Sequence, residues 1–260
     1  MTRASAILDR LPPRVAIPLL ARFGHQDPEV AFLRNFVKPG DTVMDVGAHK
    51  GAYTWHLARL VGASGRVHAF EPQPHHASRL SRGVAPQVVV HPLALSASEH
   101  LDRLVTPIWG DTQMYGHATL EDLPVDTAVE TVEIRATTPD SLDLDPTFAK
   151  IDIEGHEVAM LQGSEDTMSR HRPVLLVEID YRHQLETKRR AELISWLMGH
   201  DYRVHYVIGN DLSEPVELSA DTEPNSKIKN SPYIFNWFMI PAQRRSFIRR
   251  PCPWRDCDAL

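Results

Sequence analysis

Short apolar runs alternate along much of this chain with longer segments whose apolar residues recur every three or four positions. The first pattern is typical of buried strands and the second of helices with one buried face. Residues 173–180 are nearly continuous in apolar character, as parallel strands covered on both faces are. Strands are expected at residues 42–46, 66–70, 88–95, 148–155, 173–180, 202–208 and 233–240. Helices are expected from about residue 28 to 37 and at residues 53–61, 73–82, 138–142, 158–168 and 191–197. The pattern predicts an α/β, doubly wound fold.

The alternation is interrupted between residues 96 and 137. Residues 101–106 and 129–136 alternate as exposed antiparallel strands do. Residues 109–117, between them, are rich in glycine, aromatic and polar side chains. Long loops in compact domains are more often functional than merely connecting. We interpret residues 96–137 as an insertion that forms a substrate lid; a disordered surface excursion is the alternative.

The first expected strand runs directly into Gly47 and Gly51, and a helix follows at once. A strand that ends in glycine and opens a helix is the first unit of a nucleotide-binding fold. A dinucleotide fingerprint also needs a glycine between these two, but residue 49 is histidine. Asp45, at the strand tip, would repel a phosphate. A cationic ligand without phosphate suits this turn better, and S-adenosylmethionine (SAM) has that character.

A second carboxylate supports this interpretation. Glu71 directly follows the strand expected at residues 66–70 and lies about 20 residues beyond the glycine turn. At this position it could accept hydrogen bonds from both ribose hydroxyls. Ala94 and Leu95 end the third strand, so topology alone predicts that they lie near the adenine. Each glycine taken alone could equally mark an ordinary turn.

Composition limits the other possibilities. The 260 residues are 42% hydrophobic and 24% charged, as expected for one large globular domain. A net charge of -6 argues against general nucleic-acid binding. Cys252 and Cys257 cannot form a disulfide framework or a closed zinc site, which favours a reducing, cytoplasmic location. No apolar run approaches the roughly 20 residues of a membrane span. Residues 1–26 are expected to be an N-terminal extension, 27–243 the domain, and 244–260 an arginine-containing tail.

Four motifs occur in order: Asp-Val-Gly-Ala-His-Lys-Gly at 45–51, Ala-Phe-Glu-Pro at 69–72, Lys-Ile-Asp-Ile-Glu-Gly at 150–155 and Pro-Val-Leu-Leu-Val-Glu-Ile at 173–179. Together they resemble the FkbM-type SAM-dependent methyltransferases over residues 28–240. The resemblance implies a three-layer Rossmann-like sandwich whose seven-stranded, mostly parallel sheet has the order 3-2-1-4-5-7-6 and an antiparallel last strand. It also implies methyl transfer to a hydroxyl of a sugar or natural product. The cofactor-binding residues it implies are Asp45, Gly47, Ala48, Gly51, Glu71 and Pro72. His49 and Lys50 depart from the small or amide residues that are usual in the turn.

The chemistry of methyl transfer to a hydroxyl requires a base that removes the proton as the new bond forms. The candidates at the carboxyl edge of the sheet are Asp152, Glu154 and His156, followed by Glu178, and by His117 or His49 if a loop folds over. Alternating side-chain directions would place Asp152 and Glu154 on one strand face. Such a pair could polarise the acceptor, bind the cofactor, or hold a divalent ion with Glu178 or Asp180. We expect a site without metal. Glu154 could instead cap the following helix.

Other functions remain open or are disfavoured. A nucleic-acid base methyltransferase would show an Asn/Asp-Pro-Pro-aromatic run after the fourth strand, where residues 152–155 read Asp-Ile-Glu-Gly. A non-catalytic SAM-binding scaffold and a methyltransferase acting on a nitrogen stay possible. The expected partner is a small-molecule acceptor. Trp109, Met114 and Tyr115 suggest that it is partly apolar, and the chain could form a homo-oligomer.

Overall fold

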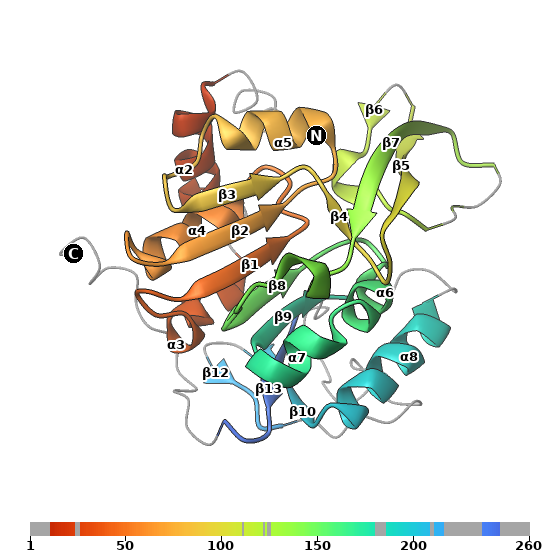
Figure 1. Ribbon diagram of the computed structural model, residues 1–260. Coiled ribbons are helices and arrows are strands. Elements are labelled where there is room, and N and C mark those ends of the chain that lie inside the picture. The colour runs from red at the N-terminus through yellow and green to blue at the C-terminus, as the bar shows by residue number, and fades with distance from the viewer. Residues whose placement is uncertain are drawn as a thin grey trace.

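The computed structural model describes residues 11–23, 27–110, 112–121, 123, 126–179, 186–208, 211–215 and 236–244. Its main feature is a seven-stranded sheet in the order β10-β13-β9-β8-β1-β2-β3 (Figure 1). These strands are β1 (Thr42–Val46), β2 (Arg66–Phe70), β3 (Val88–His91), β8 (Phe148–Ile151), β9 (Val174–Glu178), β10 (Tyr202–His205) and β13 (Asn236–Pro241). Only β13 runs antiparallel to its two neighbours, β9 and β10.

The expected topology is therefore found. Numbered along this sheet alone, the strands read 3-2-1-4-5-7-6, and the last one is antiparallel. Three expected strands are shorter or divided. The strand expected at 148–155 ends at Ile151, and 202–208 divides into β10 and β11 (Val207–Ile208), which pairs with β12 (Asp211–Leu212). Residues 88–95 divide into β3 and β4 (Ala94–Leu95), and β4 pairs with β7 (Val129–Thr137) of a second sheet. Pro92 lies at the break. A proline has no N–H to donate to the ladder, so the strand is interrupted there.

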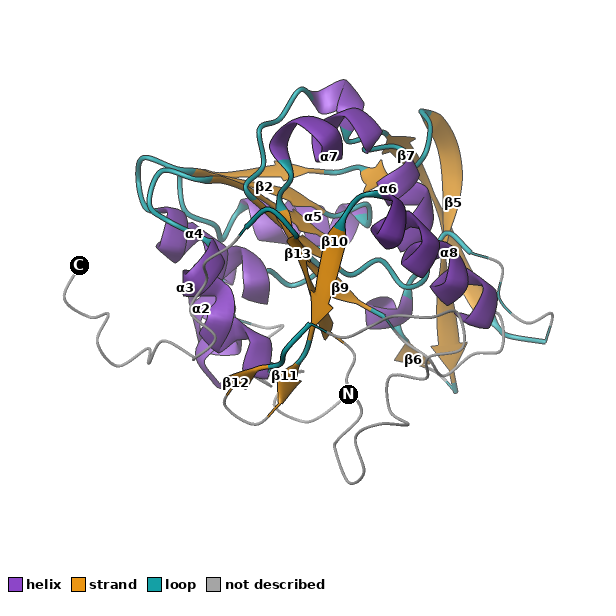
Figure 2. Cartoon of the chain, turned by 90° about the horizontal axis from the view of Figure 1, so that it is seen from below, coloured by secondary structure: helices purple, strands orange, loops and turns teal. Residues whose placement is uncertain are grey.

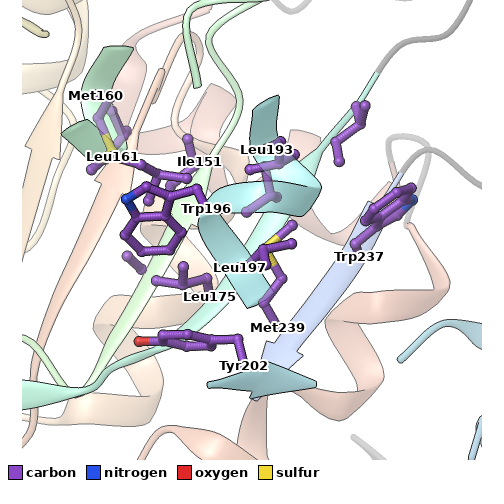
Figure 3. Close-up of a cluster of buried hydrophobic side chains, with 14 of the residues drawn as sticks. Ile151, Met160, Leu161, Leu175, Leu193, Trp196, Leu197, Tyr202, Trp237 and Met239 are labelled. Atoms are coloured by element: carbon purple, nitrogen blue, oxygen red, sulfur yellow. The ribbon is translucent and has the colours of Figure 1, made fainter. Parts of the chain in front are cut away.

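Helices cover both faces of the sheet, which gives the three-layer sandwich (Figures 1 and 2). One layer contains α2 (Pro13–Phe23), α3 (Leu33–Phe36), α4 (Ala52–Val61) and α5 (Pro74–Ser81). The other contains α6 (Glu157–Gln162), α7 (Glu165–His171) and α8 (Glu186–Gly199). Figure 3 shows the core under α8, where Leu197 packs against Leu175 of β9 and Met239 of β13; all three side chains are fully buried. Burial of such side chains is the main stabilising contribution to the fold.

The helix expected from residue 28 is only partly present. Residues Pro28–Phe32 form a 3₁₀ helix, η1, and only Leu33–Phe36 are α-helical. Asp27 does not cap this segment with its side chain. Its Oδ2 instead accepts a hydrogen bond of 2.9 Å from the Tyr53 hydroxyl of α4. The aspartate therefore ties the start of the domain to α4.

Residues 96–137 build most of a second sheet, in the order β4-β7-β5-β6. Its long strands, β5 (His100–Trp109) and β7 (Val129–Thr137), are antiparallel, as predicted. The shorter elements are β6 (Thr112–Gln113) and the 3₁₀ helix η2 (Tyr115–His117). Figure 1 shows this sheet beside the carboxyl ends of β2 and β3. The insertion is thus an ordered lobe in its described part, not a disordered excursion.

The remaining described elements are η3 (Asp140–Leu142), β11 (Val207–Ile208) and β12 (Asp211–Leu212). In the N-terminal segment, α2 packs on α4, and His56 Nε2 lies 3.2 Å from the carbonyl oxygen of Ala21. Residues 1–10 and 245–260, which include Cys252 and Cys257, lie outside the described residues. Among the helices that the structure describes, none combines the length and apolar character needed to cross a membrane.

Candidate active site

A cavity of ≈ 670 Å³, open to solvent, lies at the carboxyl ends of β1, β2 and β8, which is where open α/β sheets bind ligands. Its lining comes from the main sheet on one side and from the insertion on the other. The lining residues are Val46, Gly47, His49, Phe70, Glu71, Pro72, Gln73, Leu93, Ala94, Leu95, Leu104, Tyr115, Gly116, Ala118, Thr119, Leu120, Asp152, Ile153, Glu154 and His156.

Gly47 joins the ends of two neighbouring strands. It has φ +81°, and a Cβ there would lie 1.8 Å from the carbonyl oxygen of Asp152. Glycine is therefore required because the chain after β8 passes directly over the chain after β1, and not only because a ligand must approach. Gly51, with φ +85°, has a different role: a Cβ there would lie 2.4 Å from Leu80 Cδ1 of α5.

Three predicted cofactor residues lie behind the cavity wall. Gly51 does not line the cavity, and neither do Asp45 and Ala48. Asp45 is 2% exposed and accepts a hydrogen bond from the Thr54 hydroxyl, while burial raises the pKa of its carboxyl to about 6. Ala48 packs in a small apolar cluster with Leu80. Their contacts are with the protein, so direct contact with a ligand in this cavity is not supported for them.

Glu71 lies in the cavity wall beside Gly47, with only 4% of the residue exposed. Its Oε2 accepts a hydrogen bond of 2.7 Å from the His49 N–H, and its Oε1 accepts one of 2.9 Å from the Gln73 N–H. His49 has the left-handed φ of +47°, which is unusual for a residue other than glycine and is associated with functional sites. Burial raises the pKa of Glu71 to about 7, although both N–H donors favour the ionised form.

The insertion is fastened to the main sheet around the cavity by several polar contacts. Gln73 Nε2 donates to the carbonyl oxygen of Tyr115 at 3.2 Å, and Thr119 Oγ1 donates to that of Glu154 at 2.7 Å. His156 bridges two segments, with Nδ1 2.7 Å from Glu121 Oε1 and Nε2 2.9 Å from Ser96 Oγ. The insertion therefore forms a wall of the site.

The segment after β8 differs from the prediction. The strand ends at Ile151, and Glu154 has φ +51° in the turn that follows. Strand alternation does not extend to Glu154, so Asp152 and Glu154 do not share a strand face, although both line the cavity. At the start of α6, the carboxylate of Glu157 accepts the N–H of Gly155 at 3.1 Å, and the carboxylate of Glu154 lies 3.6 Å from His117 Nδ1.

Asp152 lies opposite Glu71 across the Gly47 turn and has a side chain that is 34% exposed. Its Oδ2 is 3.2 Å from the ammonium nitrogen of Lys150, which is also 3.8 Å from Glu178 Oε2. This places a buried cation between two carboxylates that the sequence suggested as possible metal ligands. Asp180, the other suggested ligand, lies outside the described residues.

The family follows from a comparison with known protein families. The family model described as the methyltransferase FkbM domain matches residues 45–204, which is more than half of the chain. The chain belongs to the FkbM methyltransferase family. The cofactor of these methyltransferases is S-adenosylmethionine. No curated protein was found to match this FkbM methyltransferase.

Several solved structures are similar in fold. A methyltransferase FkbM from Methylobacillus flagellatus KT has 19% identity and a TM-score of 0.45, over 77% of this chain and 53% of that one. The O-methyltransferase TomG from Streptomyces achromogenes, solved with SAM, has 13% identity and a TM-score of 0.46, over 92% and 89%. A SAM-dependent O-methyltransferase from Thermotoga maritima has 14% identity and a TM-score of 0.45, over 88% and 72%. Our chain thus spans about half the length of the Methylobacillus protein, and these similarities say nothing about its substrate.

The structure divides the predicted site residues of this FkbM methyltransferase into those that line the cavity and those that do not. Those in the cavity wall are Gly47, His49, Glu71, Pro72, Ala94, Leu95, Asp152, Glu154 and His156. Those that do not line it include the predicted cofactor residues Asp45, Ala48 and Gly51 and the candidate bases His117 and Glu178. Sequence reasoning missed Gln73 and Thr119, whose contacts depend on how the insertion folds back. It also missed Lys150, although a lysine within the apolar run Phe-Ala-Lys-Ile was a visible signal for a paired buried charge.

Proposed function

We propose that this chain is a SAM-dependent O-methyltransferase that acts on a hydroxyl of a small molecule, a sugar moiety or another natural product. The observation that carries the proposal is the presence of two carboxylates, Glu71 and Asp152, in one cavity on either side of Gly47. One carboxylate is held by N–H groups at the end of β2, where a ribose would bind; the other follows the fourth strand, where an acceptor would lie.

In this proposal Glu71 binds the ribose hydroxyls. Each of its oxygens accepts one backbone N–H and has a further lone pair for a hydroxyl. Pro72 continues this wall, and the apolar side chains of Ala94, Leu95 and Phe70 suit the faces of an adenine. The main chain of the Gly47 turn lines the cavity and would face the methionine end of SAM. The contribution of Asp45, Ala48 and Gly51 is to shape this turn from behind.

Asp152 is proposed as the general base. SAM supplies an activated methyl group, so the protein mainly has to hold donor and acceptor in line and take up one proton. SAM would supply the methyl group for the acceptor oxygen and would leave as the neutral thioether. Asp152 would take up the proton that the acceptor hydroxyl loses. Asp152 fits this role because its carboxylate is partly exposed in the cavity.

Glu154 and His156 fit a positioning role better than a catalytic one. The carbonyl oxygen of Glu154 accepts Thr119, and its carboxylate lies 3.6 Å from His117 Nδ1. Both ring nitrogens of His156 are engaged by Glu121 and Ser96. These two residues therefore hold the insertion over the cavity.

The first test is a calorimetric titration of the protein with SAM, followed by transfer of a labelled methyl group to a panel of glycosides and aglycones. We expect SAM to bind and the label to appear as an O-methyl ether by nuclear magnetic resonance. Absence of both heat and a thermal shift would contradict SAM binding. Label on nitrogen would move the proposal to an N-methyltransferase, and binding without transfer to any acceptor would favour a scaffold.

Glu71→Gln should weaken SAM binding by about 10- to 100-fold, because one oxygen becomes an amide that faces a backbone N–H and cannot accept from a hydroxyl. It should also reduce the pH dependence of binding. The pKa of Glu71 is about 7 in the free protein. A cationic ligand favours the carboxylate, so binding releases part of a proton, and affinity should rise with pH until about 7 and then level off.

Calorimetry between pH 5.5 and 8.5 would measure both effects. Glu133→Gln, an exposed change of the same kind on β7, is the control and should leave the affinity unchanged. Wild-type affinity and an unaltered pH dependence in Glu71→Gln would remove Glu71 from the cofactor site.

A further inference from the structure

Lys150 is an unusual residue for the centre of a sheet. It lies in β8 between apolar neighbours, and its side chain is only 2% exposed. Lysine is almost never fully buried unless it is paired, because its ammonium loses its hydration. Here Nζ lies 3.2 Å from Asp152 Oδ2 and 3.8 Å from Glu178 Oε2, and 5.1 Å from the ring centroid of Tyr53.

The surroundings of Lys150 are acidic on every packed side. The charged or titratable groups that act on it or lie near it are Asp152 after β8, Glu178 of β9, Asp45 of β1, Tyr53 of α4 and Glu29 of η1. Burial alone would lower the pKa of Lys150, but the carboxylates of Asp152, Glu178 and Asp45 raise it above its usual value. Lys150 therefore stays charged throughout the working pH range.

We propose that Lys150 is a positioning residue for proton transfer: its buried ammonium, 3.2 Å from Asp152 Oδ2 and 3.8 Å from Glu178 Oε2, holds the Asp152 carboxylate in the direction that faces the cavity. The inference rests on the proposed function, because Asp152 is the base there. Lys150 does not line the cavity, so it would act through Asp152 and not by touching the substrate.

The geometry explains why two nearby carboxylates do not compete for the role of base. Burial, followed by the charge of Asp152, raises the pKa of Glu178 to about 8, although Lys150 lowers it. Glu178 therefore holds a proton more readily than an ordinary glutamate, and Asp152 is the carboxylate closer to Nζ. The contact with Lys150 keeps the Asp152 carboxyl directed at the cavity while it takes up the proton of the acceptor.

The ammonium also occupies the position that a divalent ion would take between Asp152 and Glu178. A metal held by these two carboxylates would have to displace a buried cation that is fixed in β8. The sequence suggested that these carboxylates provide either a base or an ion-binding pair. In this inference Asp152 is the base, and the cation that the two carboxylates share is the ammonium of Lys150.

Lys150→Met tests this inference, with the exposed Lys38→Met as the matched control. We expect kcat to fall by about 10- to 100-fold in Lys150→Met, with the SAM dissociation constant within about twofold of wild type. The acidic limb of the kcat–pH profile should move to higher pH, because the carboxylate loses the cation that favours its charge. Lys150→Arg keeps the charge and should keep the wild-type limb. An unmoved limb in Lys150→Met would overturn the proposal.

A second measurement needs no turnover. The carboxyl resonance of Glu178, followed by carbon-13 nuclear magnetic resonance, should titrate near pH 8 in the wild type and above that in Lys150→Met. If Lys150→Met does not fold, Asp152→Asn provides the readout: loss of the neighbouring charge should lower the Glu178 midpoint, and an unchanged midpoint would overturn the proposal. If these shifts are observed but the wild type transfers no methyl group, the proposed function is wrong, whereas the interaction of Lys150 with Asp152 and Glu178 is still supported.

Discussion

Asp152→Asn is expected to lower kcat for methyl transfer by about 10²- to 10⁴-fold, which corresponds to roughly 3 to 5 kcal/mol of transition-state stabilisation. Asparagine has almost the same shape as aspartate but cannot accept the acceptor's proton. Since the carboxylate is proposed to act mainly in the transition state, the loss should appear in kcat and in kcat/KM and leave the SAM dissociation constant nearly unchanged. Steady-state kinetics combined with calorimetry separates these quantities.

Asp143→Asn is the matched control for this prediction. Asp143 has a side chain that is 90% exposed, and its left-handed φ of +49° is tolerated by asparagine. Its substitution should change neither kcat nor the SAM affinity. Normal turnover in Asp152→Asn would exclude this residue as the base. A loss confined to SAM binding would instead assign Asp152 to the cofactor site, the other role that its position after β8 suggests.

Much of the fold could be predicted because most of its elements carry a simple local signal. Apolar runs such as residues 173–180 and the periodic helix at 53–61 do not depend on distant contacts for their recognition. The break of the third strand at Pro92 was readable in principle, since proline cannot donate to a ladder. The pairing of β4 with β7, which follows from this break, could not be predicted because it joins segments some 40 residues apart.

The sequence was sufficient to predict that the glycine turn and the acidic residues belong to the candidate site. It was not sufficient to predict how these residues are arranged relative to one another. The prediction placed Glu154 on a strand face, whereas its φ of +51° turns the chain away from β8. Lys150 illustrates the same limit. Its neighbour Glu178 becomes visible only when β8 and β9 pair in register, with Lys150 opposite Leu176. The contacts that fasten the insertion, such as Thr119 to Glu154, likewise arise from tertiary folding.

Gly47→Ala is expected to destabilise the fold by about 4 kcal/mol or more and to abolish methyl transfer, which is far beyond the usual effect of one added methyl group. Two causes act together at Gly47, because its φ is +81° and an added Cβ would lie 1.8 Å from a main-chain oxygen. Main-chain atoms cannot rotate away as a flexible side chain can, so the ends of β1 and β8 would have to separate. Gly110→Ala isolates the first cause, because Gly110 has φ +59° with nothing within 4 Å of its Cβ position. The control should cost only about 1–2 kcal/mol. Urea unfolding of both variants measures the difference, and equal losses would show that the close approach of the two strand ends does not stabilise the site.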